Sequence, residues 1–194
     1  GSACTTRVLP NTAEAPSHPQ DSADDDPNLL LLMIDPISQP LFKQTLPKTL
    51  GLLQDMGFVS FEKYTVVGDN SGPNQAALYS GLGLVGRTDI SSQQKDRFQW
   101  IWDDLRQKKG YETFKAEDGC IRNSNMVASI QPNTTHGSVL HEMNCFDFQR
   151  PNCIGHEPAA EHLMRHVSQF ITEYSKRGKW AAFASFVDSH EDTM

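Results

Sequence analysis

The chain has 194 residues, of which 38% are hydrophobic and 21% charged, and its formal net charge is −7. This composition is typical of one globular domain with a proper core. The acidic balance and the lack of a basic patch argue against nucleic acid as a partner. The longest apolar run has only the length of a strand, so the sequence predicts no transmembrane segment.

Residues 1–27 differ in amino-acid composition from the rest of the chain. They contain four prolines and an acidic run, Asp24 to Asp26, which predicts a flexible N-terminal arm. Residues 28–194 alternate apolar runs with amphipathic segments, which predicts a single α/β domain. The chain begins with Gly1-Ser2 rather than methionine, so we expect a processed or cut product.

The first elements follow from apolar runs and their stops. Leu29 to Ile34 is continuously apolar and ends at Asp35-Pro36, which predicts a strand buried on both faces of a parallel sheet. Residues 47–56 predict a helix that turns Leu50, Leu52 and Leu53 inward and stops at Gly57. Residues 58–67, which are rich in valine and aromatic side chains, predict a second strand.

The later elements continue the alternation of strands and helices. A glycine-containing loop at 68–72 precedes a short helix that Pro73 opens and that ends near Ser80, and residues 81–95 predict a surface loop. Helices are predicted over 96–109 and 158–174, strands over 111–116 and 180–187, and a loop-rich stretch over 119–157. This alternation predicts a mostly parallel, doubly wound sheet with flanking helices.

Polar, chemically competent residues follow three of the predicted strands. Asp35 follows the first strand directly, Glu117 and Asp118 follow another, and the last is followed by Asp188, His190, Glu191 and Asp192. Sites in open α/β sheets form beyond the carboxyl ends of strands, and carboxylates with imidazoles suit a divalent metal. The alternative is that these residues are polar only because loops are polar.

A serine precedes the predicted helix that Pro73 opens. Ser71 lies in the stretch Gly68-Asp69-Asn70-Ser71-Gly72-Pro73-Asn74. The free N–H groups and the dipole of a helix N-terminus favour an anion there, and would also stabilise a serine alkoxide. The alternative is a purely structural N-cap.

Three stretches together resemble the eukaryotic sulfatase-like branch of the alkaline phosphatase superfamily, a branch labelled as a domain of unknown function. They cover about residues 28–192, in the order of the family. They comprise Met33–Ser38 with Leu46–Thr49, then Val67–Asn74, then Cys145–Asn152 with Ser189–Asp192. The resemblance implies an alkaline phosphatase-like α/β fold, of which this chain would form an incomplete, N-terminal portion.

The resemblance also implies roles for four residues. Asp35 matches the first metal-binding aspartate, and Ser71 matches the nucleophile, which also binds the metal. Asn74 would lie near the substrate anion, and His190 near the leaving group or substrate. The implied cofactor is a divalent metal, zinc or calcium.

The chain departs from the family pattern at three points. The branch usually has threonine where Ser71 stands, and the arginine that sulfatases need for formylglycine maturation is replaced by Gln75. A plain hydroxyl nucleophile therefore favours phosphate over sulfate esters. The chain lacks the Asp-His pair that completes the superfamily's metal site, so we expect the site to be incomplete within these residues.

The leading hypothesis is a fragment of a secreted, metal-dependent hydrolase or transferase acting on a small anionic ester or glycoconjugate. The alternatives are a catalytically inactive secreted binding module with the same fold and a sulfatase acting on sugar sulfates. Asn133-Thr134-Thr135 is a glycosylation sequon, and Cys145 and Cys153 could close a small loop by a disulfide. Both fit an extracellular or secretory-lumen glycoprotein, and the substrate and the oligomeric state stay open.

Overall fold

The structure is a computed structural model that describes residues 26–69, 71–82, 99–118, 136–137, 153–154 and 156–186. Most of the predicted arm over residues 1–27 lies outside the described residues, as do the glycosylation sequon at Asn133 and Cys145. Along the chain the elements are β1 (Leu29–Ile34), α1 (Gln39–Thr45), α2 (Pro47–Asp55), α3 (Ser71–Ser80), α5 (Ile101–Lys109), β2 (Glu112–Glu117), β3 (His136–Gly137), β4 (Cys153–Ile154), β5 (Glu157–Pro158), α7 (Ala159–Tyr174) and β6 (Trp180–Phe186).

A parallel sheet organises the molecule and confirms the predicted α/β class. Its strand order is β1-β6-β2-β3, and each neighbouring pair is parallel, while β4 and β5 form a separate antiparallel pair. The last strand in sequence, β6, therefore lies between β1 and β2. Crossovers of this kind place helices on the faces of the sheet.

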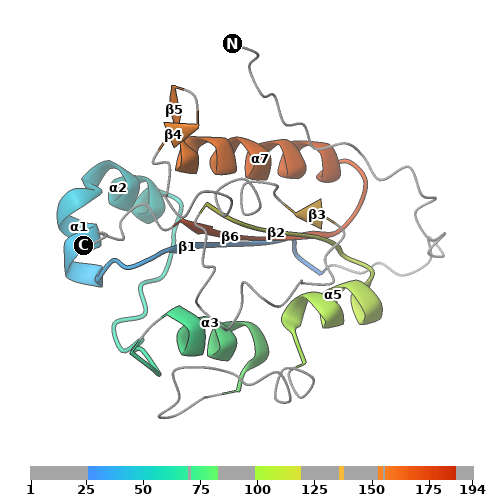
Figure 1. The fold of residues 1–194 in the computed structure, drawn as a ribbon, viewed down its shortest axis with the longest axis horizontal. Helices are drawn as coiled ribbons and strands as arrows, with labels where there is room; N and C mark the ends of the chain where they lie inside the picture. The colour runs from blue at the N-terminus through green and yellow to red at the C-terminus, as the bar shows by residue number, and fades with distance from the viewer. Residues whose placement is uncertain are drawn as a thin grey trace.

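Helices cover both faces of the sheet, with α7 on one side and α3 and α5 on the other (Figure 1). Successive side chains of a strand point to opposite faces, so β6 contributes to two cores. The core beneath α7 contains Phe114, Ala116, Leu163, Val167, Phe170, Tyr174, Trp180, Ala182, Ala184 and Phe186. The core beneath α3 and α5 contains Ala76, Tyr79, Trp100, Trp102, Tyr111, Ala181 and Phe183.

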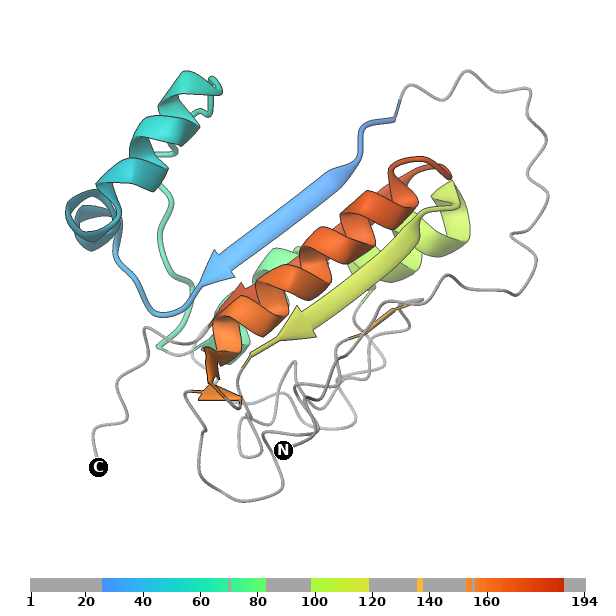
Figure 2. The same ribbon diagram turned by 90° about the horizontal axis from the view of Figure 1, so that it is seen from above.

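The edge strand β1 differs from its prediction. Its bounds are as expected, but it is not buried on both faces: half-buried and exposed residues alternate along it. Leu30, Leu32 and Ile34 are the exposed set. Figure 2 shows the reason, since α7 runs over β6 and β2 and leaves this face of β1 without a covering element among the described residues.

The segment between β1 and α3 also departs from the sequence prediction. Residues 58–67 form no strand; they are extended around a turn at Glu62-Lys63, and all are exposed. Valine and aromatic residues favour strands only where a neighbouring strand pairs with them, and this segment has no such neighbour in the described part of the chain. α1 was not predicted, and in α2 Leu52 is exposed rather than inward-facing.

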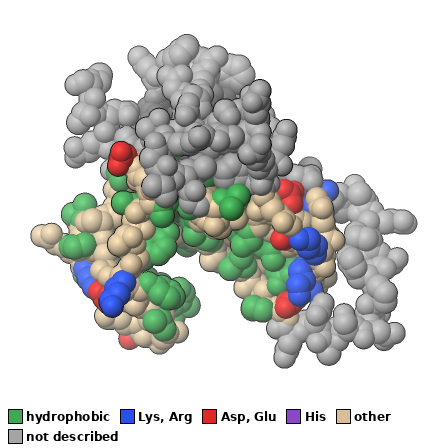
Figure 3. All heavy atoms as spheres, turned by 90° about the horizontal axis from the view of Figure 1, so that it is seen from below, with side chains coloured by type: hydrophobic (Ala, Val, Ile, Leu, Met, Phe, Trp, Pro, Cys, Tyr) green, Lys and Arg blue, Asp and Glu red, His purple; other side chains and the backbone are tan. Residues whose placement is uncertain are grey.

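Hydrophobic side chains consequently reach solvent over a wide area. Large ones exposed between β1 and α3 include Leu41, Leu52, Met56, Phe58, Val59, Phe61 and Val66. Seen from below, hydrophobic surface lies on both sides of a hollow in the molecule (Figure 3). Among the described residues no helix combines the length and the apolar character needed to span a membrane.

The predicted helix over 96–109 begins later than expected, at Ile101, and both tryptophans near its start are buried. Trp100 and Trp102 stack with ring centroids 5.1 Å apart and planes 5° apart. Trp102 in turn lies against Tyr79 and Phe183. The helix ends at Gly110, whose φ of 69° is the left-handed conformation that glycine adopts most easily.

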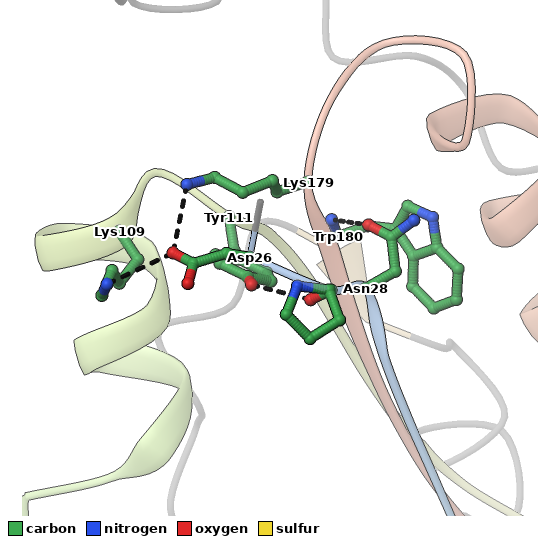
Figure 4. A network of polar contacts seen from close by, with 7 residues as sticks. Asp26, Asn28, Lys109, Tyr111, Lys179 and Trp180 are labelled. Carbon is green, nitrogen blue, oxygen red and sulfur yellow. Dashed lines mark hydrogen bonds and ion pairs between the residues drawn. The ribbon is translucent and has the colours of Figure 1, made fainter. Parts of the chain in front are cut away.

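A polar network holds the amino end of β1 against β6 and β2 (Figure 4). The Asn28 side chain accepts a hydrogen bond from the Trp180 backbone N–H at 3.0 Å, and the Tyr111 hydroxyl donates to the Pro27 carbonyl at 2.8 Å. Asp26 pairs with Lys109 at 3.2 Å and with Lys179 at 3.6 Å. Because these contacts lie at the first residues of the sheet, they help to fix the register in which β1 pairs with β6.

The two-sided packing of β6 can be tested with one substitution at two phenylalanines. Phe183 is fully buried and lies against Tyr79 and Trp102, with ring centroids 5.9 and 6.0 Å away, whereas Phe61 is 77% exposed. Phe183→Ala should lower the free energy of unfolding by about 3–5 kcal/mol. Phe61→Ala should change it by less than about 0.5 kcal/mol. Urea unfolding followed by tryptophan fluorescence measures both, and equal losses would refute this assignment of the core.

Candidate functional site

Two of the acids that follow strands extend the sheet at its carboxyl end. Asp35 extends β1, and its backbone N–H donates to the Phe186 carbonyl at 2.8 Å. Asp118 extends β2, and its backbone N–H donates to the Ser185 carbonyl at 3.2 Å. The two aspartates thus flank the end of β6, two strand spacings or about 10 Å apart.

The first helical residue of α3 contacts one of these aspartates. The Ser71 hydroxyl donates a hydrogen bond to Asp35 Oδ2, although 36 positions separate the two residues in sequence. Asp35 continues the pairing of β1 with the end of β6, and α3 lies against the same face of the sheet as Leu29 and Leu31. The hydroxyl is therefore directed to a carboxylate from within the helix, which differs from the N-cap alternative.

Asn74 is engaged by the backbone of the loop that leads into α3. Its Oδ1 accepts a hydrogen bond from the Val67 N–H at 2.8 Å, and its Nδ2 donates to the Gly68 carbonyl at 2.8 Å. The side chain thus holds residues 67 and 68 against the first turn of the helix. Its predicted contact with a substrate anion stays a prediction.

Gly68 and Pro73 fix how closely that loop approaches the helix. A Cβ added to Gly68 would lie 2.4 Å from Pro73 Cγ and 2.7 Å from Pro73 Cβ. These distances are too short for real atoms, and both the proline ring and the backbone are stiff. Glycine at 68 is therefore required by close contact, and it sets the path of the chain into Ser71.

Polar and ionisable groups also line the sheet face beneath α3. Lys115 and Glu117 of β2 pair in register with Phe183 and Ser185 of β6, and they share the face that packs against α3 and α5. Burial lowers the pKa of Lys115, and the nearby Glu117 charge opposes that change. Burial raises the pKa of Tyr79 to about 12; the Ser185 hydroxyl opposes the rise and the Glu117 charge adds to it.

The structure describes only some of the other predicted site residues. His190 lies outside the described residues, with Asp188, Glu191 and Asp192. Glu117 and Asp118 are described and buried at the end of β2. The sequence analysis did not single out Lys115 or Tyr79, and it named Gln75 only for the arginine that it replaces. The four-residue spacing places Ser71, Gln75 and Tyr79 on one face of α3.

Two oxygen donors of the kinds that divalent metals bind are in contact at this end of the sheet. A carboxylate and a hydroxyl, from Asp35 and Ser71, are in contact, and both are ligand types that zinc and calcium accept. Within the described ranges no group of three or more histidine, cysteine or acidic side chains lies close enough to hold a metal. The contact joins two oxygen donors, and the metal site predicted for Asp35 and Ser71 stays a prediction.

The contact between Gly68 and Pro73 can be tested against a second glycine. Gly68→Ala should displace the loop or the start of α3 and lower the free energy of unfolding by about 1–3 kcal/mol. Gly51, inside α2, has no atom within 4 Å of an added Cβ, so Gly51→Ala should raise stability by about 0.5–1 kcal/mol. Thermal unfolding separates the two, and a neutral Gly68→Ala would contradict the close approach.

The raised pKa of Tyr79 has a consequence at alkaline pH. The folded state holds the phenol proton more tightly than the unfolded state, so this stabilisation is complete below pH 10 and is lost between pH 10 and 12. Tyr79→Phe removes the dependence, so the stability of the wild type relative to this variant should fall by about 2 kcal/mol over that range. Urea unfolding of both proteins at pH 9 and pH 11.5 measures the difference, and a constant difference would exclude the effect.

Comparison with known proteins places the chain in a family. The model of the family described as "Protein of unknown function (DUF229)" matches residues 2–194. No curated protein and no solved structure matches the chain. Since the match covers nearly every residue, the chain belongs to the DUF229 family.

Proposed function

We propose that this chain carries the nucleophile and the first metal-binding carboxylate of a metal-dependent hydrolase or transferase that acts on phosphate esters. One observation carries the proposal: the Ser71 hydroxyl at the start of α3 donates to the Asp35 carboxylate at the carboxyl end of the parallel sheet. A hydroxyl oriented by a carboxylate, at a helix N-terminus that favours anions, is equipped for nucleophilic attack.

In the proposed reaction, Ser71 Oγ forms a bond to the phosphorus atom of the ester. The hydroxyl proton moves towards Asp35, whose carboxylate already accepts it as a hydrogen bond. The bond from phosphorus to the ester oxygen breaks, and the alcohol leaves with a proton that we assign to His190. Water, or a second alcohol in a transferase, then attacks phosphorus and gives its proton to His190. The bond from phosphorus to Ser71 Oγ breaks, and Asp35 returns the proton to that oxygen.

Asp35 and Ser71 are also the residues that we propose for the divalent metal. Zinc or calcium, when bound, would neutralise the ester oxygens and stabilise the alkoxide form of Ser71. Asp35 holds the hydroxyl in position in either case, because its backbone continues the pairing of β1 with the end of β6. Asn74 keeps the entry to α3 fixed through its two bonds to residues 67 and 68.

Phosphate is the preferred chemistry for two reasons. A serine hydroxyl attacks phosphorus directly, whereas the sulfatase mechanism starts from a matured formylglycine. Gln75 occupies the position at which that maturation motif has arginine. We further propose that the protein acts in the secretory lumen or outside the cell, on the basis of the Asn133 sequon and its cysteines.

Two serines on the same helix provide the test. In the full-length protein, Ser71→Ala should lower the turnover of 4-nitrophenyl phosphate by about 10³-fold or more, because it removes the attacking atom. Ser80 lies at the other end of α3 and makes only local bonds, with the Ala76 carbonyl and the Leu82 N–H. Ser80→Ala should retain full turnover, and comparable turnover by Ser71→Ala would remove the nucleophile from the proposal.

Metal binding distinguishes an enzyme from a binding module that keeps only the fold. Calorimetry of the full-length protein with Zn²⁺ and with Ca²⁺ should show micromolar or tighter binding of one of them. Asp35→Ala should abolish that binding, since it removes the carboxylate that Ser71 contacts. No binding of either ion to the wild type would favour the inactive binding module.

A further inference from the structure

One buried side-chain N–H donor on α3 makes no hydrogen bond among the described residues. Gln75 is only 2% exposed, and no acceptor among the described residues lies within hydrogen-bond distance of its Nε2. Leaving a buried donor unpaired is costly, and such groups are rare in folded proteins. A hydrogen-bond acceptor from beyond the described residues, such as a bound ligand, would satisfy this donor.

The position of Gln75 indicates where that partner would bind. It stands four residues after Ser71 and four before Tyr79, so the three side chains follow one face of α3. That face is turned towards the sheet: Ser71 contacts Asp35, and the Tyr79 ring lies 5.9 Å from Phe183. Helical side chains lean towards the helix N-terminus, which directs the Gln75 amide towards Ser71.

The neighbouring amide on the same turn is already in use. Asn74 Oδ1 and Nδ2 are both hydrogen-bonded to the backbone of residues 67 and 68. Gln75 therefore supplies the amide N–H that α3 still offers beside the hydroxyl. An amide N–H directed at a helix N-terminus matches an anionic oxygen, because donor and dipole act on it together.

We infer that Gln75 donates a hydrogen bond from Nε2 to a non-bridging oxygen of the tetrahedral anion held at Ser71. The inference rests on the proposed function and names one more residue of the same site. Gln75 is then a binding residue that orients the phosphate group towards Ser71 Oγ. In the absence of the anion, Gln75 Nε2 stays buried without an acceptor among the described residues.

The test compares anion binding with stability in the full-length protein. Gln75→Leu keeps the size of the side chain but removes the amide. It should weaken the binding of inorganic phosphate by tenfold or more in calorimetry, and should leave the unfolding temperature unchanged or raise it, because the Nε2 donor that is removed has no acceptor among the described residues. A purely structural role would give the opposite pattern, with lower stability and unchanged phosphate affinity.

Two further measurements separate the possible failures. In ¹H–¹⁵N spectra, the Gln75 side-chain pair, identified by its absence in Gln75→Leu, should shift when phosphate is added. Leu78 faces away from the sheet and is 37% exposed, so Leu78→Ala should bind phosphate as the wild type does. If the wild type binds phosphate and Gln75→Leu binds it equally well, only the role of Gln75 is overturned.

Suppose that the wild type binds neither inorganic phosphate nor inorganic sulfate, and turns over neither 4-nitrophenyl phosphate nor 4-nitrophenyl sulfate. The proposed function then fails, and the role of Gln75 fails with it. Binding of sulfate in place of phosphate, weakened by Gln75→Leu, would support the donor and reassign the substrate class. Stronger binding of phosphate than of sulfate is the expected result.

Discussion

The register in which β1 pairs with β6 is the constraint on which the site depends. Leu29 pairs with Ala181 and Ile34 with Phe186, so the next residue, Asp35, stands level with the end of β6 on the side of α3. A slip of one residue would turn every side chain of β1 to the opposite face. Asp35 would then point away from α3, and Ser71 would lose the carboxylate that it contacts.

The two ends of the sheet differ in what they do for this register. At the amino end, Asn28 accepts a hydrogen bond from Trp180 at the start of β6, and Tyr111 donates to Pro27 just before β1, about 20 Å from the site for a strand of this length. At the carboxyl end, Asp35 and Asp118 follow β1 and β2 beside the end of β6. Contacts that fix the strand therefore lie apart from the groups that we propose for chemistry.

The aromatic layer under the sheet plays the corresponding part for α3. Tyr79 lies against Trp102 and Phe183, and Trp102 stacks on Trp100. These contacts anchor the second half of the helix, while Gly68 and Asn74 fix the chain that enters it. The backbone of Ser71 is thus held from both sides, which fixes its position relative to Asp35.

Sequence reasoning succeeded where a local pattern decides the structure. The apolar runs of β1 and β6, the helix of α7 and the glycine stop of α5 were all predicted from the residues themselves. Sequence reasoning failed where contact with another segment of the chain decides the structure. Phe58 to Val67 has the residues of a strand, but no described strand lies beside it, and Leu30 is exposed because no described element covers that face.

The candidate site shows the same division. The position at a strand end predicted a site role for Asp35, and the position at a helix start predicted one for Ser71. Each residue also had a purely structural alternative, a polar loop residue or an N-cap. Their contact depends on the register of the sheet and on the placement of α3, neither of which can be read from spacing. The unpaired amide of Gln75 could not be foreseen at all, since it depends on which acceptors the fold brings near.

The open edge of β1 also bears on how this polypeptide behaves in concentrated solution. No described strand pairs with its outer side, and its six residues carry neither charge nor proline. Natural proteins usually protect such an edge, because a bare one is a template on which another chain can add its own strand. Expressed on its own, the chain has in β1 the segment through which aggregates would grow, and a lysine in place of Leu32 would be the simplest way to keep it dispersed.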